Sequence, residues 1–132
     1  LCFMVLKKEV NEEQDYRMSN FFVRAAGVSG ALAVAAGAIG AHAMMHKEES
    51  YREAWKTGSA YHLIHSCILG TVAYSANPRK RVICGSLFLA GIILFSGSLY
   101  TVAFMSQRKP YSYPAPVGGL CLIGGWLAFA IL

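Results

Sequence analysis

The chain has 132 residues, of which 55% are hydrophobic and only 14% are charged. Soluble domains usually carry about 25% charged residues, so this composition argues against an ordinary soluble enzyme, and its hydrophobicity excludes intrinsic disorder. The formal net charge is +5 at pH 7, but the basic residues separate long apolar runs. They do not form the basic face that nucleic-acid binding requires, so we expect no nucleic-acid partner.

Four apolar segments follow one another along the chain. A bilayer core about 30 Å thick needs about 20 apolar residues in a helix, and each segment reaches that length. We therefore predict an all-α integral membrane protein, a four-helix bundle with short loops over residues 21–132. The spanning helices are predicted at about 21–45, 54–76, 82–106 and 113–132, and residues 1–20 form a polar N-terminal tail.

The polar tail contains an acidic tract, Glu9 to Asp15, which argues against a transit peptide. We expect this tail to extend from the membrane and to dock on a neighbouring protein. Deleting residues 1–17 should then release the chain from its partner.

Short connections make neighbouring helices antiparallel, so four spans place both termini on the same side. On that side we count six basic residues, Lys7, Lys8, Arg17, Arg79, Lys80 and Arg81. The opposite side carries four, Lys47, Arg52, Arg108 and Lys109. Because basic residues favour the inner side of a membrane, both termini are predicted to face the cytoplasm or the mitochondrial matrix.

Small residues recur at steps of three and four on two of the predicted helices. The first helix carries Ala26, Gly30, Ala33 and Gly37, and the last repeats the pattern from Gly118. In lipid such stripes let helix backbones approach closely. Two interpretations remain open: tight packing inside one bundle, or an external docking face, including one for a second copy of the chain.

Polar residues inside the predicted spans are functional candidates, because they are costly in lipid. His62 and His65 are three positions apart and share a helix face. The candidate polar cluster consists of His42, His62, His65, Ser98 and Tyr100. It is compatible with a structural hydrogen-bond network, a metal or haem site, a quinone or lipid site, or proton-coupled transport.

No catalytic or metal-binding constellation can be assembled from the remaining residues. No carboxylate follows Glu53, so every acid lies in the tail or the first loop, and the four cysteines are widely spaced. We expect no enzyme activity, no catalytic residue, no metal and no resident cofactor. The basic loop at Arg79, Lys80 and Arg81 is predicted to bind anionic lipid headgroups such as cardiolipin.

Four short motifs in order resemble a known family of small membrane proteins. They are residues 37–42 (GAIGAH), 61–65 (YHLIH), 95–100 (FSGSLY) and 116–119 (PVGG) with the later Gly125-Trp126 pair. The chain from about residue 25 onward is similar to the domain of unknown function 423, or transmembrane protein 256-like, family. This resemblance implies a four-helix integral membrane protein of bacterial inner membranes and of eukaryotic organelles, mainly mitochondria. It implies no established activity.

We therefore expect a non-enzymatic accessory or assembly subunit of a larger mitochondrial inner-membrane complex, with the respiratory chain as the leading case. Both termini would face the matrix, and the partners would be membrane lipids and other membrane-protein subunits. The alternative is a small membrane carrier, or a haem-, quinone- or lipid-binding protein that uses the polar cluster.

Overall fold

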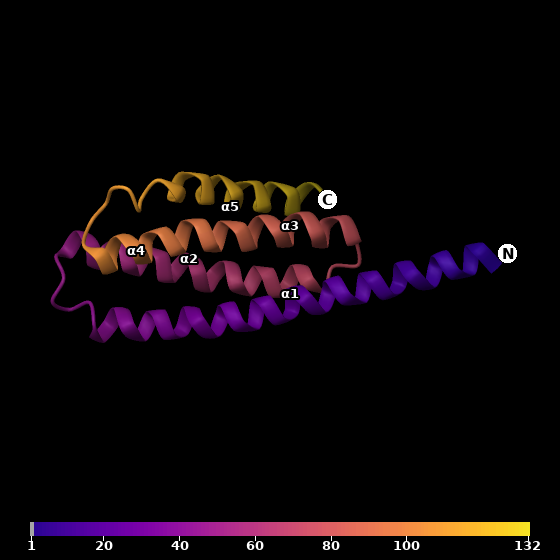
Figure 1. The fold of residues 1–132 in the computed structure, drawn as a ribbon, viewed down its shortest axis with the longest axis horizontal. Coiled ribbons are helices and arrows are strands. Elements are labelled where there is room, and N and C mark those ends of the chain that lie inside the picture. Colours follow the sequence, from indigo (N-terminus) through magenta and orange to yellow (C-terminus); the bar gives the residue numbers. More distant parts are fainter. Residues whose placement is uncertain (1) are drawn as a thin grey trace.

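The computed structural model describes residues 2–132 as helices joined by short loops (Figure 1). The helices are α1 (Cys2–His42), α2 (Glu49–Ala73), α3 (Pro78–Gly91), α4 (Gly97–Met105) and α5 (Pro114–Ile131). A π-helical segment, η1 (Ile92–Ser96), joins α3 to α4 without a break. α3, η1 and α4 therefore form one rod, and the predicted all-α fold of four membrane helices is confirmed.

Three of the four rods are long and apolar enough to span a membrane. The helices that qualify by length and composition lie at Lys7–His42, Pro78–Met105 and Pro114–Ile131. α2 is more polar, but it lies antiparallel between α1 and the α3–α4 rod and connects to both through short loops (Figure 1). It must therefore cross the same layer as its neighbours, and its buried residues include His62, His65 and Ser66.

The four rods are arranged mainly as a row. α1 packs on α2, α2 packs on the α3–α4 rod, and α5 packs on α3 and η1, while α1 also meets α3, where the Phe22 ring lies against Gly85. Among the described residues α1 and α5 make no contact, and they lie at opposite edges of the row (Figure 1). The two chain ends and the α2–α3 loop lie at one end, as the even number of spans predicts.

The predicted polar tail differs most from the structure, because α1 continues through it. Lys, Glu and Gln are good helix formers, and pairs four residues apart support the helix, with Arg17 Nη2 2.9 Å from Glu13 Oε1. α1 has 41 residues and α2 has 25, which correspond to about 60 Å and 37 Å. The N-terminal part of α1 therefore projects beyond the bundle (Figure 1).

The remaining helix bounds lie near the predicted ones. The first spanning helix ends at His42, and the rods predicted at 54–76, 82–106 and 113–132 occupy 49–73, 78–105 and 114–131. α2 starts earlier because hydropathy does not detect its charged first turns. The α3 rod starts earlier because Pro78 takes a first-turn position behind the Asn77 cap.

The small-residue stripes pack inside the bundle. A Cβ added at Gly40 of α1 would lie 2.6 Å from Cδ1 of the Trp55 ring on α2, and one at Gly30 would lie 4.0 Å from Ser66 Cβ. A Cβ added at Gly118 of α5 would collide with the η1 backbone. The stripe on α1 thus serves the α1–α2 contact, as the first interpretation predicts, and docking of another chain on this helix stays a prediction.

Candidate functional site

His62 lies at the centre of a hydrogen-bond network that joins α1, α2 and α4. Its Nδ1 is 3.1 Å from the Tyr100 hydroxyl, and its Nε2 is 3.0 Å from the Ser29 hydroxyl. The Ser29 Oγ lies 2.6 Å from the Ser66 Oγ, and the Ser66 hydroxyl donates to the His62 carbonyl at 2.7 Å. Ser29, His62 and Ser66 are all buried.

The geometry of this network assigns a direction to each hydrogen bond. Since Ser66 donates its proton to the His62 carbonyl, Ser29 must donate to Ser66. Ser29 therefore accepts from the Nε2–H of His62, and the Nδ1 of His62 accepts from Tyr100. The relay ends on a backbone carbonyl, so the network links three helices without reaching an external acceptor.

His65 forms a separate contact that joins α2 to α5. Its Nδ1 lies 2.7 Å from the Tyr61 carbonyl, and the Trp126 indole N–H donates to its Nε2 at 3.2 Å. Because an indole nitrogen only donates, Nε2 must be the acceptor and Nδ1 must carry the proton. His62 and His65 are therefore held in opposite neutral tautomers.

The structure divides the predicted polar cluster instead of gathering it. His62 contacts Tyr100 of α4, but His65 contacts Trp126 of α5. The two side chains point in different directions because three residues turn a helix through 60° less than a full turn. Since α2 has helices on both sides, each histidine meets a different one. His42 is exposed at the last residue of α1, at the end of the bundle. The Ser98 hydroxyl donates to the Tyr111 carbonyl and so holds the α4–α5 loop.

Three partners in these networks were not predicted: Ser29, Ser66 and Trp126. Isolated serines in apolar helices carry no distinctive signal. Trp126 belongs to the Gly125-Trp126 pair of the family motifs, but that pair does not indicate a histidine partner. Only the helix register brings them to the histidines.

The ring nitrogens of both histidines are engaged by the protein. Neither ring offers a free nitrogen to a metal ion or to haem iron as the side chains stand. The described residues also contain no cluster of three potential metal-ligating side chains. The expectation of no metal site stays a prediction.

A second polar site lies at the end of the bundle that carries both termini. Arg81 of α3 is only 5% exposed, and its guanidinium pairs with the Asp15 carboxylate of α1. It also donates to the Asp15 carbonyl at 3.2 Å and to the Ser75 carbonyl. One turn further along, the Ser19 hydroxyl donates to the Ala73 carbonyl at 2.8 Å. The base of the projecting helix is therefore fixed to α2, to the α2–α3 loop and to α3.

This pairing corrects the prediction for Arg81, which is buried against protein and is not available to a lipid headgroup. The neighbouring Arg79 is exposed, and the Lys80 ammonium lies 4.2 Å from the centre of the Phe129 ring. Headgroup binding stays a prediction for Arg79 and Lys80.

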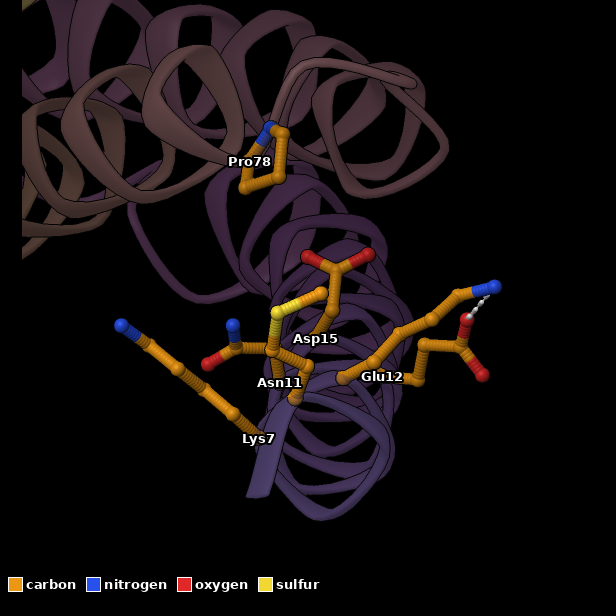
Figure 2. Close-up of a pocket in the computed structure, with 7 residues that line it drawn as sticks. Lys7, Asn11, Glu12, Asp15 and Pro78 are labelled. Atoms are coloured by element: carbon orange, nitrogen blue, oxygen red, sulfur yellow. Dashed lines mark ion pairs between the residues drawn. The ribbon is translucent and has the colours of Figure 1, made fainter. Parts of the chain in front are cut away.

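A hollow of about 430 Å³ opens where the projecting helix meets the start of α3 (Figure 2). Lys7, Asn11 and Asp15 lie along one side of the helix, with Pro78 above Asp15 across the hollow (Figure 2). Lys8 Nζ pairs with Glu12 Oε1 at 3.9 Å beside it. The hollow is lined by Met4 and Pro78 as well as by charged and amide side chains and is wide open, so it resembles a surface for a protein segment more than a small-molecule pocket.

Comparisons with known proteins identify relatives along most of the chain. Residues 36–119 match the family described as protein of unknown function (DUF423). The chain is 34% identical over 115 residues to the UPF0382 membrane protein YwdK of Bacillus subtilis, an alignment that covers 83% of this chain and 93% of the relative.

Two further bacterial relatives show the same extent of similarity. A UPF0382 membrane protein of Haemophilus influenzae is 36% identical, with 86% of this chain and 93% of the relative covered. The UPF0382 inner membrane protein YgdD of Escherichia coli K12 is 35% identical, with 82% of this chain and 85% of the relative covered. No solved structure matches the chain.

Proposed function

This chain belongs to the DUF423 family of membrane proteins, and we propose that it acts as a non-enzymatic accessory or assembly subunit of a larger inner-membrane complex. The observation that carries this proposal is the projecting part of α1. α1 is 16 residues longer than α2, since it has 41 residues and α2 has 25, and the excess corresponds to about 24 Å.

The projecting helix is suited to contact another protein. Seven of the eleven residues from Lys7 to Arg17 are charged, so this segment lies outside the hydrocarbon layer. Exposed apolar side chains, Met4 at 69% and Tyr16 at 68%, stand among the charges. A single helix of this length is marginal in water unless packing supports it. The Asp15–Arg81 pair supports its base, and we propose that a partner subunit covers the remainder.

The interior of the bundle supports a role without catalysis. His62, His65, Ser29 and Ser66 are used in helix–helix hydrogen bonds, and no carboxylate follows Glu53 near the start of α2. Proton relays in membranes are built from Asp, Glu and His side chains, and both histidines here are already engaged on both ring nitrogens.

We propose an inner membrane as the location, because a relative in Escherichia coli is named an inner membrane protein. In a eukaryotic cell the corresponding site is the mitochondrial inner membrane, with the respiratory complexes as the partners to examine first. The larger number of basic residues at the end of the bundle that carries both termini favours the cytoplasmic or matrix side for them.

A truncation can test the docking role without disturbing the bundle. The deletion should remove residues 1–14 and stop there, because Asp15 is needed to pair with Arg81. A second variant replaces residues 1–14 with an alanine-rich helix of equal length, which keeps the rod and removes its side chains. After digitonin extraction and affinity capture, both variants should lose the subunits that accompany the full chain. Unchanged capture with both would overturn the proposal.

A further inference from the structure

α2 and α5 leave a groove between them in the middle of the bundle. Among the described residues their backbones do not pack on each other, and the Trp126–His65 hydrogen bond spans the gap. The groove lies beside this bond and is lined by α2, α5 and η1. Its volume is about 510 Å³. Small-molecule sites in proteins commonly fall at roughly 300–1,000 Å³.

The groove lies at the depth of the bilayer interior. Tyr61 is the middle residue of α2, about 18 Å from either end. No charged side chain is among the lining residues, which are aromatic, aliphatic and glycine apart from His65. A ligand at this position must therefore be neutral and must enter from the lipid.

Four rings form the walls. The Tyr61 ring centre is 4.8 Å from that of Phe95 and 5.7 Å from that of His65, with 25° between the planes of Tyr61 and His65. The Trp126 ring stands edge-on to His65 at 6.3 Å. Aromatic walls favour a flat ring, which gains stacking contacts that a branched chain does not.

The polar groups of the groove leave one donor free. Both nitrogens of His65 and the N–H of Trp126 are used within the protein. The Tyr61 hydroxyl forms no hydrogen bond with a described residue, although Tyr61 is 43% exposed at a depth where lipid offers no acceptor. A hydroxyl that faces hydrocarbon without a partner is costly, so a ligand with an acceptor oxygen is favoured.

We propose that this groove binds the head ring of a lipid-soluble quinone, with the Tyr61 hydroxyl donating to a ring carbonyl. A quinone is neutral and planar, carries carbonyl acceptors and dissolves in the bilayer, where its isoprenoid tail can remain. This site lies apart from the projecting helix and does not depend on the docking role.

The two tryptophans of the chain provide a reporter and a control. Trp126 lines the groove, whereas Trp55 is buried on the Tyr100 ring and donates to the Ala36 carbonyl. The full chain is placed in phosphatidylcholine nanodiscs as Trp55→Phe or as Trp126→Phe and titrated with decylubiquinone, because quinones quench indole fluorescence on contact. In Trp55→Phe, quenching of Trp126 fluorescence should reach saturation as quinone is added. In Trp126→Phe, quenching of Trp55 fluorescence should rise only in proportion to the bulk quinone concentration. Equal quenching of both would overturn the proposal.

Two substitutions in the Trp55→Phe background locate the bound ring. A Cβ added at Gly119 would lie 3.8 Å from Phe95 Cδ2, an ordinary contact, so Gly119→Leu should fill the groove and abolish saturation. Gly124→Leu is the matched control, since its Cβ would meet only Leu87 Cδ1 at 3.8 Å. Saturation that persists in Gly119→Leu would place the quinone elsewhere and overturn the proposal.

Tyr61→Phe tests the hydrogen bond. One neutral hydrogen bond corresponds to about a 2- to 10-fold weakening of quinone binding. Tyr74→Phe is the control, because Tyr74 is 77% exposed at the end of α2 and does not line the groove. Unchanged affinity in Tyr61→Phe, or equal displacement of the quinone by an alkane chain without a carbonyl, would assign the groove to ordinary lipid.

Discussion

The carboxylate of Asp15 pairs with the guanidinium of Arg81 across 66 residues of sequence and fixes the projecting part of α1 to the start of α3. The charge predicted to meet a lipid headgroup is instead used within the protein. Because α1 is one continuous helix, the pair holds the start of its projecting part against the bundle.

Removing Asp15 should destabilise the protein more than removing a neighbouring acid. Breaking a fully buried pair costs about 3–5 kcal/mol, and Asp15→Ala should cost less, about 2–3 kcal/mol, because the Asp15 side chain is 40% exposed. The Asp15→Ala/Arg81→Met double variant should recover part of this loss, since it leaves no buried charge. Thermal unfolding in detergent measures both.

The control for this prediction is Glu13→Ala, which breaks the pair between Glu13 and Arg17 on the exposed surface. It should cost less than about 1 kcal/mol. Equal losses from Asp15→Ala and Glu13→Ala would contradict the anchoring role of Asp15.

The His62 network should stabilise the bundle measurably. Tyr100→Phe removes the donor to His62 Nδ1 and leaves a buried acceptor unsatisfied, so the free energy of unfolding should fall by about 0.6–1.5 kcal/mol. Ser29→Ala should have a similar effect from the other side of the ring. Thermal unfolding of the Tyr100→Phe/Ser29→Ala double variant tests the coupling. A loss of stability equal to the sum of the two single losses would contradict a coupled network.

The apolar runs were sufficient to predict the four rods, because lipid demands about 20 apolar residues for each crossing. They could not predict the helical state of the tail, since hydropathy does not report helix propensity in polar segments. The histidines were identified because polar groups in lipid are conspicuous. The split between His62 and His65, and the serine partners of His62, depend on which neighbour each face of α2 meets, and that information is tertiary.

Substitution of Gly118 in α5 should destabilise the protein, whereas substitution of Gly27, on the lipid side of α1, should not. Gly118→Ala would place a methyl group against the Phe95 backbone nitrogen, which cannot move away like a side chain. We expect a loss of about 1–3 kcal/mol. Gly27→Ala meets nothing within 4 Å and should be neutral or stabilising by up to about 1 kcal/mol. Equal unfolding temperatures for the two variants would contradict the close α5–η1 contact.

The pKa of the Glu53 carboxyl should lie below that of an ordinary glutamate. Glu53 lies one residue before the predicted span, and the hydrogen bond and charge of Lys56 lower its pKa. Because the folded pKa is lowered, the stabilisation is present above the ordinary carboxyl pKa and is lost as pH falls through the lowered value. Carboxyl carbon NMR should show the Glu53 pKa rising in Lys56→Met and unchanged in Lys47→Met. A Glu53 pKa that stays the same in Lys56→Met would contradict this assignment.

The docking role of the projecting helix is tested most directly by the native size of the chain in its own membranes. Membranes are extracted with digitonin, separated on a native gel and probed for this chain. The proposed function predicts migration with known subunits of one complex, at a size far above the 14.3 kDa of the chain. Migration as a small species at every detergent concentration, with no accompanying subunit, would contradict it.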